Sequence, residues 1–204
     1  MYHSKAYDNL IKQFNAIGLE KKDGFYSRVM EEIHDWERAE VEDFIWDAFT
    51  NKNQIELAQF LPKLEKYDGI KALKESSYLF KIPSEASVEI GKLLYEGTGD
   101  EKYLDLIKQN IDASPETISY VSILSRCKPC HRLYSILSDI YINNINKVNR
   151  STAVMGLLYN KGIIRDINSI EETNNVISLR KKFKSEDCEE RKKILERFER
   201  GDLV

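Results

Sequence analysis

The residues of this sequence with the clearest chemical potential are Cys127, Cys130 and His131, in the run Cys-Lys-Pro-Cys-His. A C-x-x-C-H run is the attachment signal of c-type haem, in which the histidine is an axial ligand. Two thiols at this spacing also suit dithiol redox chemistry, because a cysteine at a helix N-terminus has a lowered pKa. A third possible chemistry is zinc binding, which requires two further ligands at fixed spacing.

The rest of the sequence does not supply the context that these chemistries require. Haem attachment needs export, and residues 1–14 lack the apolar stretch of a secretory signal. Dithiol motifs normally accompany alternating strands and helices, and Cys188 alone cannot complete a zinc site. We therefore interpret Cys127 and Cys130 as ordinary residues at a helix start. A thiol- or metal-dependent enzyme centred on Cys127, Cys130 and His131 is the alternative.

Other catalytic patterns are incomplete. Glu31 and His34 form one Glu-x-x-His motif, whereas a di-iron site in a helical bundle needs two such motifs. The sequence contains no phosphate-binding loop with its lysine, no nucleophile elbow and no metalloprotease motif. We therefore expect a protein without enzymatic activity, metal or cofactor.

A tryptophan among carboxylates is the stronger functional signal. Between Glu31 and Asp47 the chain carries eight acidic residues and one basic residue, Arg38. In a helix over about residues 37–50, turning about 100° per residue, one stripe is apolar and the opposite face is acidic. The apolar stripe comprises Val41, Phe44, Ile45, Ala48 and Phe49, and the opposite face comprises Glu40, Asp43, Trp46 and Asp47.

An exposed tryptophan among carboxylates is typical of an anchor for a basic protein partner. We therefore predict a partner-binding surface at Glu40, Asp43, Trp46 and Asp47. The alternative is that Trp46 packs against the neighbouring helix pair. Trp36 lies at the junction of two expected helices, and we expect it in the core.

Helical periodicity extends over nearly the whole chain and predicts an all-α fold of about ten helices in antiparallel pairs. Ser4 is expected to cap a first helix, with Leu10, Ile11, Phe14 and Ile17 on one face and Gly18 at its end, and a second helix is expected after Asp23. Ser84 and the pair Ser114-Pro115 are expected to start later helices, and further helices are expected after Asn149 and after Asp166. Pro62 predicts a kink or boundary in a helix beginning near Ile55.

Composition places the chain among globular proteins, with 42% hydrophobic and 32% charged residues. No apolar run approaches the roughly 20 residues of a membrane span, and three cysteines do not form a disulfide framework. We therefore expect a cytoplasmic protein. Residues 1–119 carry 15 basic and 23 acidic residues, whereas residues 120–204 carry 16 and 11, so the surface is expected to have two electrostatic poles. A nucleic-acid-binding protein usually has a stronger basic excess, so we expect neither a nucleic acid nor a membrane as partner.

Two segments, residues 48–61 and 94–107, match at an offset of about 46 residues, near the 40–47 typical of HEAT and armadillo repeats. Each reads as an apolar helix end, a short turn of Asn or Gly type, and a helix with paired apolar residues. The alternation of helices and short turns over about residues 36–160 resembles HEAT-type α-solenoids, which bind partners along a concave face. A compact multi-helix domain is the alternative fold, and either is expected as a single domain over residues 1–204.

The segment from about 169 to 200 is charge-dense and departs from the repeat pattern. Ile194, Leu195 and Phe198 form a thin apolar seam that predicts a helix docked over the last core pair.

The chain also resembles some immunity proteins of bacterial polymorphic toxin systems, which are small, acidic and rich in Asn, Lys and Ile. This resemblance implies an inhibitor that neutralises a basic toxin domain. A regulatory scaffold subunit that uses both charge poles is a further alternative.

Overall fold

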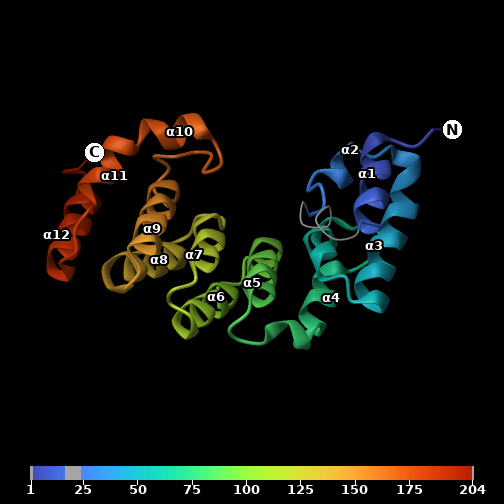
Figure 1. The fold of residues 1–204 in the computed structure, drawn as a ribbon, viewed down its shortest axis with the longest axis horizontal. Coiled ribbons are helices and arrows are strands. Elements are labelled where there is room, and N and C mark those ends of the chain that lie inside the picture. Colours follow the sequence, from blue (N-terminus) through green and yellow to red (C-terminus); the bar gives the residue numbers. More distant parts are fainter. Residues whose placement is uncertain (1, 17–23, 204) are drawn as a thin grey trace. The chain divides into compact units, whose positions relative to one another are not determined.

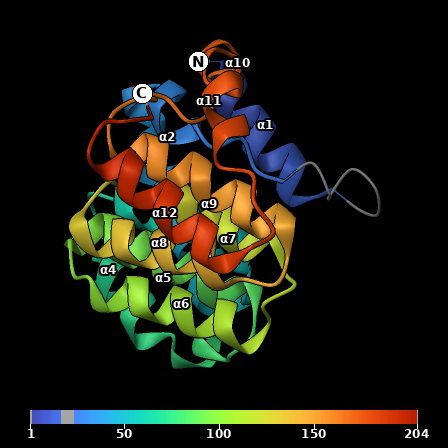
Figure 2. The same cartoon turned by 90° about the vertical axis from the view of Figure 1, so that its left-hand side faces the viewer.

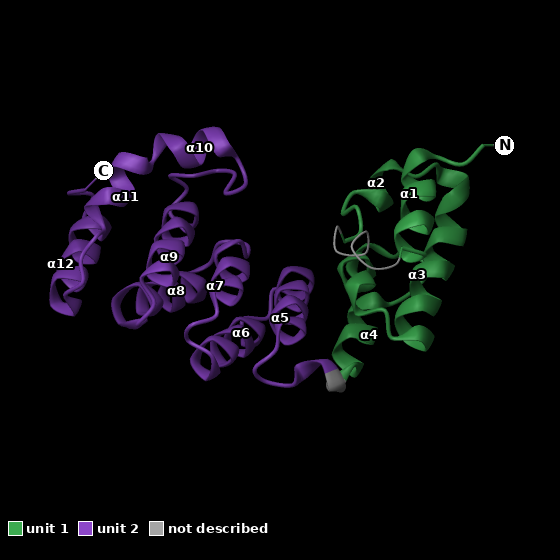
Figure 3. Cartoon of the chain, in the orientation of Figure 1, with its two compact units in different colours: residues 1–78 green, residues 79–204 purple. Residues whose placement is uncertain are grey.

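The structure, a computed structural model, describes residues 2–16 and 24–203 (Figure 1). These residues are helical or irregular and include no β-strand, which confirms the all-α prediction. The chain divides into two compact units, residues 1–78 and 79–204 (Figure 3). Each unit has a buried apolar core, with Leu10 and Ile45 in the first and Leu94 and Leu137 in the second. The single domain and the HEAT-like repeat stay predictions.

The first unit is built around one long helix, α3. Its elements are α1 (Lys5–Phe14), α2 (Val29–Glu32), η2 (Asp35–Glu37), α3 (Arg38–Lys52), η3 (Ile55–Lys63) and α4 (Gly69–Glu75), where η marks a 3-10 helix. A short 3-10 helix, η4 (Ser77–Phe80), follows at the unit boundary. As predicted, the hydroxyl oxygen of Ser4 caps α1 by accepting a hydrogen bond from the Tyr7 N–H at 3.1 Å. Ile17, Gly18 and Asp23, expected to end α1 and to precede the second helix, lie outside the described residues.

The apolar stripe of α3 faces the core of the first unit. Val41, Ile45 and Ala48 are fully buried and Phe49 is 2% exposed, as the periodicity predicts. Phe44 is half-buried and meets the edge of Phe14, with ring centroids 4.7 Å apart. The stripe therefore fixes which face of α3 remains outside.

The segment after α3 differs from the predicted α-helix. It is the 3-10 helix η3, and Pro62, which has no N–H to donate, lies near its end. The following helix, α4, starts in close contact with η3, because a Cβ at Gly69 would lie 2.0 Å from the carbonyl oxygen of Leu61. Only glycine allows this approach.

The second unit continues as packed helices. They are α5 (Glu85–Thr98), α6 (Lys102–Ala113), α7 (Ile118–Ser125), α8 (His131–Asn143), α9 (Lys147–Asn160), α10 (Ile170–Asn175), α11 (Ile177–Lys182) and α12 (Cys188–Glu199). α5 packs on α6, and α9 packs on both α7 and α8. The packing of α9 on α7 and α8 is close at Gly156, where a Cβ would lie 2.8 Å from Leu137 Cδ1 and 2.9 Å from Ser125 Cβ.

Two predicted helix starts in this unit are wrong. Ser114 ends α6, and α7 begins only at Ile118, because the carbonyl of Pro115 accepts hydrogen bonds from the side chains of Asn144 and Asn149. Helix α9 begins at Lys147 after the cap Asn146, so Asn149 lies inside the helix and is buried. By contrast, Ser84 caps α5 as predicted, with its hydroxyl accepting from the Ser87 N–H.

The charged C-terminal helix α12 docks on α8. Its seam residues Ile194, Leu195 and Phe198 are 6%, 6% and 4% exposed, so they are core residues, as the spacing predicts. No helix in the described part of the chain has both the length and the apolar character needed to cross a bilayer.

Candidate functional site

The predicted partner-binding residues lie along the outer side of α3. We call Glu40, Asp43, Trp46 and Asp47 the α3 ridge. Glu40 and Asp43 are exposed, whereas Trp46 and Asp47 are half-buried. The helix therefore presents the ridge away from its buried stripe, in agreement with the spacing of the residues.

Trp46 is held by an aromatic stack. Its ring lies parallel to that of Tyr67, with centroids 4.5 Å and planes 6° apart. Asp43 accepts hydrogen bonds of 2.5 Å from both Lys66 Nζ and the Tyr67 hydroxyl. These bonds, led by that from Lys66, lower the pKa of Asp43. The loop after η3 thus fixes the orientation of both Trp46 and Asp43.

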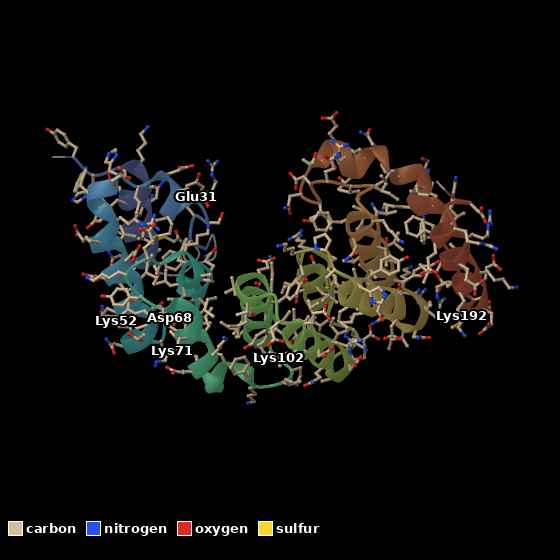
Figure 4. The ribbon with its side chains drawn as sticks, turned by 180° about the vertical axis from the view of Figure 1, so that it is seen from behind. Glu31, Lys52, Asp68, Lys71, Lys102 and Lys192 are labelled. Carbon is tan, nitrogen blue, oxygen red and sulfur yellow. The ribbon has the colours of Figure 1, made fainter. Side chains whose placement is uncertain are left out.

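Asp47 is paired within its own helix. Asn51 donates to its Oδ1 at 2.8 Å, and the Lys52 ammonium lies 2.7 Å from its Oδ2 (Lys52 is labelled in Figure 4). Hydrogen bonds from Asn51 and Lys52 lower the pKa of Asp47. Asp43 and Asp47 are therefore ionised carboxylates that already have a lysine partner, a feature that the acidic sequence pattern does not reveal.

A small pocket of about 240 Å³ opens beside Trp46, between α3 and α4. Its lining comprises Trp46, Phe49, Thr50, Asn53, Ala72, Glu75 and Ser76. Trp46 therefore lines a recess at the surface of the first unit.

An aromatic cluster that the sequence pattern does not reveal lies at the start of α3 and is formed by His3, Tyr7, His34 and Trp36. His3 stacks on Tyr7 with ring centroids 4.0 Å apart. Trp36 lies 5.3 Å from the ring of His3 and 5.9 Å from that of His34. The cluster joins the α3 ridge, because the Tyr7 hydroxyl donates to Glu40 Oε1 at 2.7 Å and this bond raises the pKa of Tyr7 to about 12.

The expectation that Trp36 lies in the core is wrong, since this residue is 45% exposed. The inward position of η2 is taken instead by Glu37, which is fully buried. Its carboxylate accepts hydrogen bonds from the Ser4 N–H at 2.7 Å and the His34 N–H at 2.8 Å. His3 Nδ1 lies 3.1 Å away. Glu37 therefore ties the N-terminal segment to η2 and leaves Trp36 outside.

The environment of Glu37 keeps its carboxylate ionised. Burial raises its pKa, but hydrogen bonds from Ser4, His34 and His3 outweigh burial and lower the pKa to about 2. A Glu three residues after the helix cap is the capping-box pattern, and this is the sequence signal that could have identified the role of Glu37.

A second buried carboxylate, Glu42, holds the loop that carries Tyr67. It is 1% exposed and accepts from the backbone N–H groups of Glu65 and Lys66. Arg38 Nε donates to it at 3.0 Å. Glu42 therefore positions the loop whose Tyr67 ring stacks on Trp46.

The Glu31-x-x-His34 pair is not brought together as a ligand set. Glu31 accepts from Lys63 Nζ at 2.9 Å, and this bond lowers its pKa. His34 stacks on Trp36. Within residues 2–16 and 24–203, no three His, Cys, Asp or Glu side chains are grouped to hold a metal ion.

The thiol motif marks the start of α8. Cys130 is the cap, and its sulfur accepts a hydrogen bond from the Leu133 N–H at 3.3 Å, while His131 is exposed in the first turn. Cys127 is fully buried, and burial raises its pKa to about 12. A protonated thiol is a poor nucleophile, so this environment opposes catalysis at Cys127. All three cysteines are free thiols.

Comparison with known proteins does not assign the chain to a family. No protein-family model matches the sequence, and no significant match was found to a curated protein or to a solved structure.

Proposed function

We propose that this protein is a non-enzymatic binding module that inhibits a basic partner, most specifically a bacterial immunity protein that neutralises a basic toxin domain. The partner would dock on the first unit, over the α3 ridge and the aromatic cluster of His3, Tyr7, His34 and Trp36. The acidic composition of residues 1–119 favours a partner of positive charge.

The observation that carries the proposal is the 45% exposure of Trp36, on a surface joined to the α3 ridge by the Tyr7–Glu40 hydrogen bond. Exposed aromatic side chains held by their neighbours are typical anchors of protein interfaces, because little side-chain entropy is lost on binding. Trp36 is held by its contacts with His3 and His34, and Trp46 by its stack on Tyr67. The surface therefore offers two oriented tryptophans with carboxylates between them.

The lysines that pair with the ridge do not oppose such docking. Lys52 and Lys66 are about half exposed, and exposed ion pairs contribute little to stability. An arginine of the partner can bind a carboxylate with two parallel hydrogen bonds, an arrangement that a single ammonium group does not provide. Exchange of a flexible lysine for such an arginine is therefore favourable at Asp43 and Asp47.

The proposal is tested with the product of the reading frame adjacent to this gene. If that product is toxic to a host cell, co-expression of this protein should restore growth, and the two purified proteins should bind. The double variant Glu40→Lys/Asp47→Lys and the single variant Trp36→Ala should each weaken binding by about tenfold or more.

The matched control is Glu171→Lys, a charge reversal at an exposed carboxylate on α10 in the second unit. It should leave binding unchanged. An adjacent product that is neither toxic nor bound would contradict the immunity role. Equal loss of binding in the control and in the ridge variants would contradict the assigned surface.

A further inference from the structure

The second unit contains a groove that no sequence motif marks. It has a volume of about 730 Å³ and lies between the first half of α9 and the segment from α11 to Glu186. Figure 2 views the molecule from the side on which α11 and α12 lie in front of α9. The volume is within the range of about 300–1,000 Å³ that is typical of ligand sites.

The lining of the groove is strongly basic. Its charged residues are Lys147, Arg150, Arg180, Lys181, Lys184 and Glu186. The one carboxylate, Glu186, already pairs with Arg150. The three lysines are exposed, and none of them has a carboxylate partner within the described part of the chain. Several unneutralised cations in a concave site produce a positive potential that attracts anions.

The two arginines are placed differently from the lysines. Arg150 is 9% exposed, and its guanidinium is fixed by hydrogen bonds to the carbonyls of Asn144 and Ile145. Arg180 donates to Ser151 Oγ at 3.2 Å, while its buried Nε has no hydrogen-bond partner in the described residues. A guanidinium has five N–H donors, so Arg180 retains donors for an acidic ligand.

The groove also has an apolar component. Val148 and Ile177 line it and are each 43% exposed. Exposed aliphatic side chains beside cations favour a ligand that carries both carboxylates and an apolar side chain.

The aromatic residues of the lining do not suit nucleic-acid bases. Tyr141 and Phe183 are buried and meet edge to face, with centroids 5.5 Å apart. The Tyr141 hydroxyl donates to the Phe183 carbonyl at 2.9 Å, and Phe183 also packs on Phe198. Because single-stranded nucleic acids bind largely by stacking bases on open aromatic faces, these engaged rings favour a peptide ligand.

We propose that this groove binds an acidic peptide segment of a protein, with carboxylates on the three exposed lysines and Arg180 and an apolar side chain against Val148 and Ile177. This site belongs to the second unit and is distinct from the surface proposed above for a basic partner. It does not depend on that function. The site lies in the part of the chain, residues 120–204, that carries the basic excess.

The test is fluorescence anisotropy of the full-length protein with a labelled peptide of alternating glutamate and leucine. The peptide should bind, and its affinity should fall as salt is added. Lys181→Glu/Lys184→Glu should weaken binding by about tenfold or more, and Ile177→Ser should weaken it at all salt concentrations. Lys193→Glu, a reversal at an exposed lysine of α12 that does not line the groove, should leave affinity unchanged.

Several outcomes overturn the proposal. These are no binding of the acidic peptide, equal binding of a glutamine–leucine peptide, an equal loss in Lys193→Glu, or tighter binding of a single-stranded oligonucleotide. Thermal unfolding of each variant shows whether it is folded. Lys181→Glu and Lys184→Glu singly, each at an exposed position, provide the same test should the double variant unfold.

Discussion

The indole of Trp46 lies flat on the phenol ring of Tyr67, with ring centroids 4.5 Å apart. The Tyr67 hydroxyl donates to Asp43, which lies about one helical turn before Trp46 on α3. This relationship joins a helix to the loop that follows η3. The loop is itself held by Glu42, whose carboxylate accepts from the N–H groups of Glu65 and Lys66. A buried carboxylate thus positions the aromatic ring that supports Trp46.

Replacement of Tyr67 should expose Trp46. Tyr67→Ala removes the stack, and an aromatic pair of this kind contributes about 0.5–1.5 kcal/mol beyond its buried area. In a Trp36→Phe background, the emission of Trp46 should shift to the red and become more accessible to acrylamide. Tyr67→Phe keeps the ring and should retain the emission of the parent. A red shift of equal size in both variants would contradict the stacking role.

The buried carboxylate of Glu37 should make the free energy of unfolding depend on pH in the acidic range. Its pKa is about 2 in the folded protein against an ordinary value of 4.5, so its stabilising effect is complete above about pH 4.5 and is lost as the pH falls towards 2. Glu37→Gln should be less stable than the parent at pH 7, and this difference should narrow below pH 4.5. Urea unfolding at a series of pH values measures this difference in the free energy of unfolding.

The control for this experiment is Glu56→Gln, at an exposed glutamate of η3. Its stability should follow that of the parent across the series. A constant difference between Glu37→Gln and the parent at every pH would show that the substitution acts by packing and not by proton binding.

Cys127 should be the least reactive thiol. Burial, followed by the charge of Glu96, raises its pKa to about 12, so little thiolate is present at pH 8. Brief treatment with iodoacetamide and peptide mass spectrometry should find Cys130 and Cys188 modified before Cys127. In urea the three rates should converge. Modification of folded Cys127 at the rate of Cys188 would contradict this assignment.

The contact between α9 and its neighbours at Gly156 should not tolerate a methyl group. In Gly156→Ala the new Cβ meets Leu137 and Ser125 at less than ordinary contact distance, and overpacking of this kind costs about 1–3 kcal/mol. Gly91→Ala is the comparison, because its Cβ would lie 3.0 Å from Ile107 Cγ1 and helix propensity favours alanine. Thermal unfolding should rank Gly156→Ala well below Gly91→Ala, and the reverse order would contradict the packing.

The local features of this protein follow from residues close together in the chain. Val41 and Ile45 lie one helical turn apart, so periodicity alone predicts that they share the buried face of α3. Ser84 caps α5 through an N–H three residues away. Asn53 and Gly99, which align in the two matching segments, both end their helices with a left-handed backbone, as the turn residues indicate.

Tertiary structure decided the features that depend on distant partners. Glu37 is buried because the N–H of Ser4, 33 residues away, replaces the water that its carboxylate loses, and Trp36 is exposed as a consequence. The basic groove likewise combines residues of α9 with residues near Phe183 that are far along the chain. Within an acidic or basic run, the sequence does not distinguish a charged side chain that will be buried from one that will be exposed. Whether it is solvated, buried or gathered around a groove depends on the donors and acceptors that folding brings beside it.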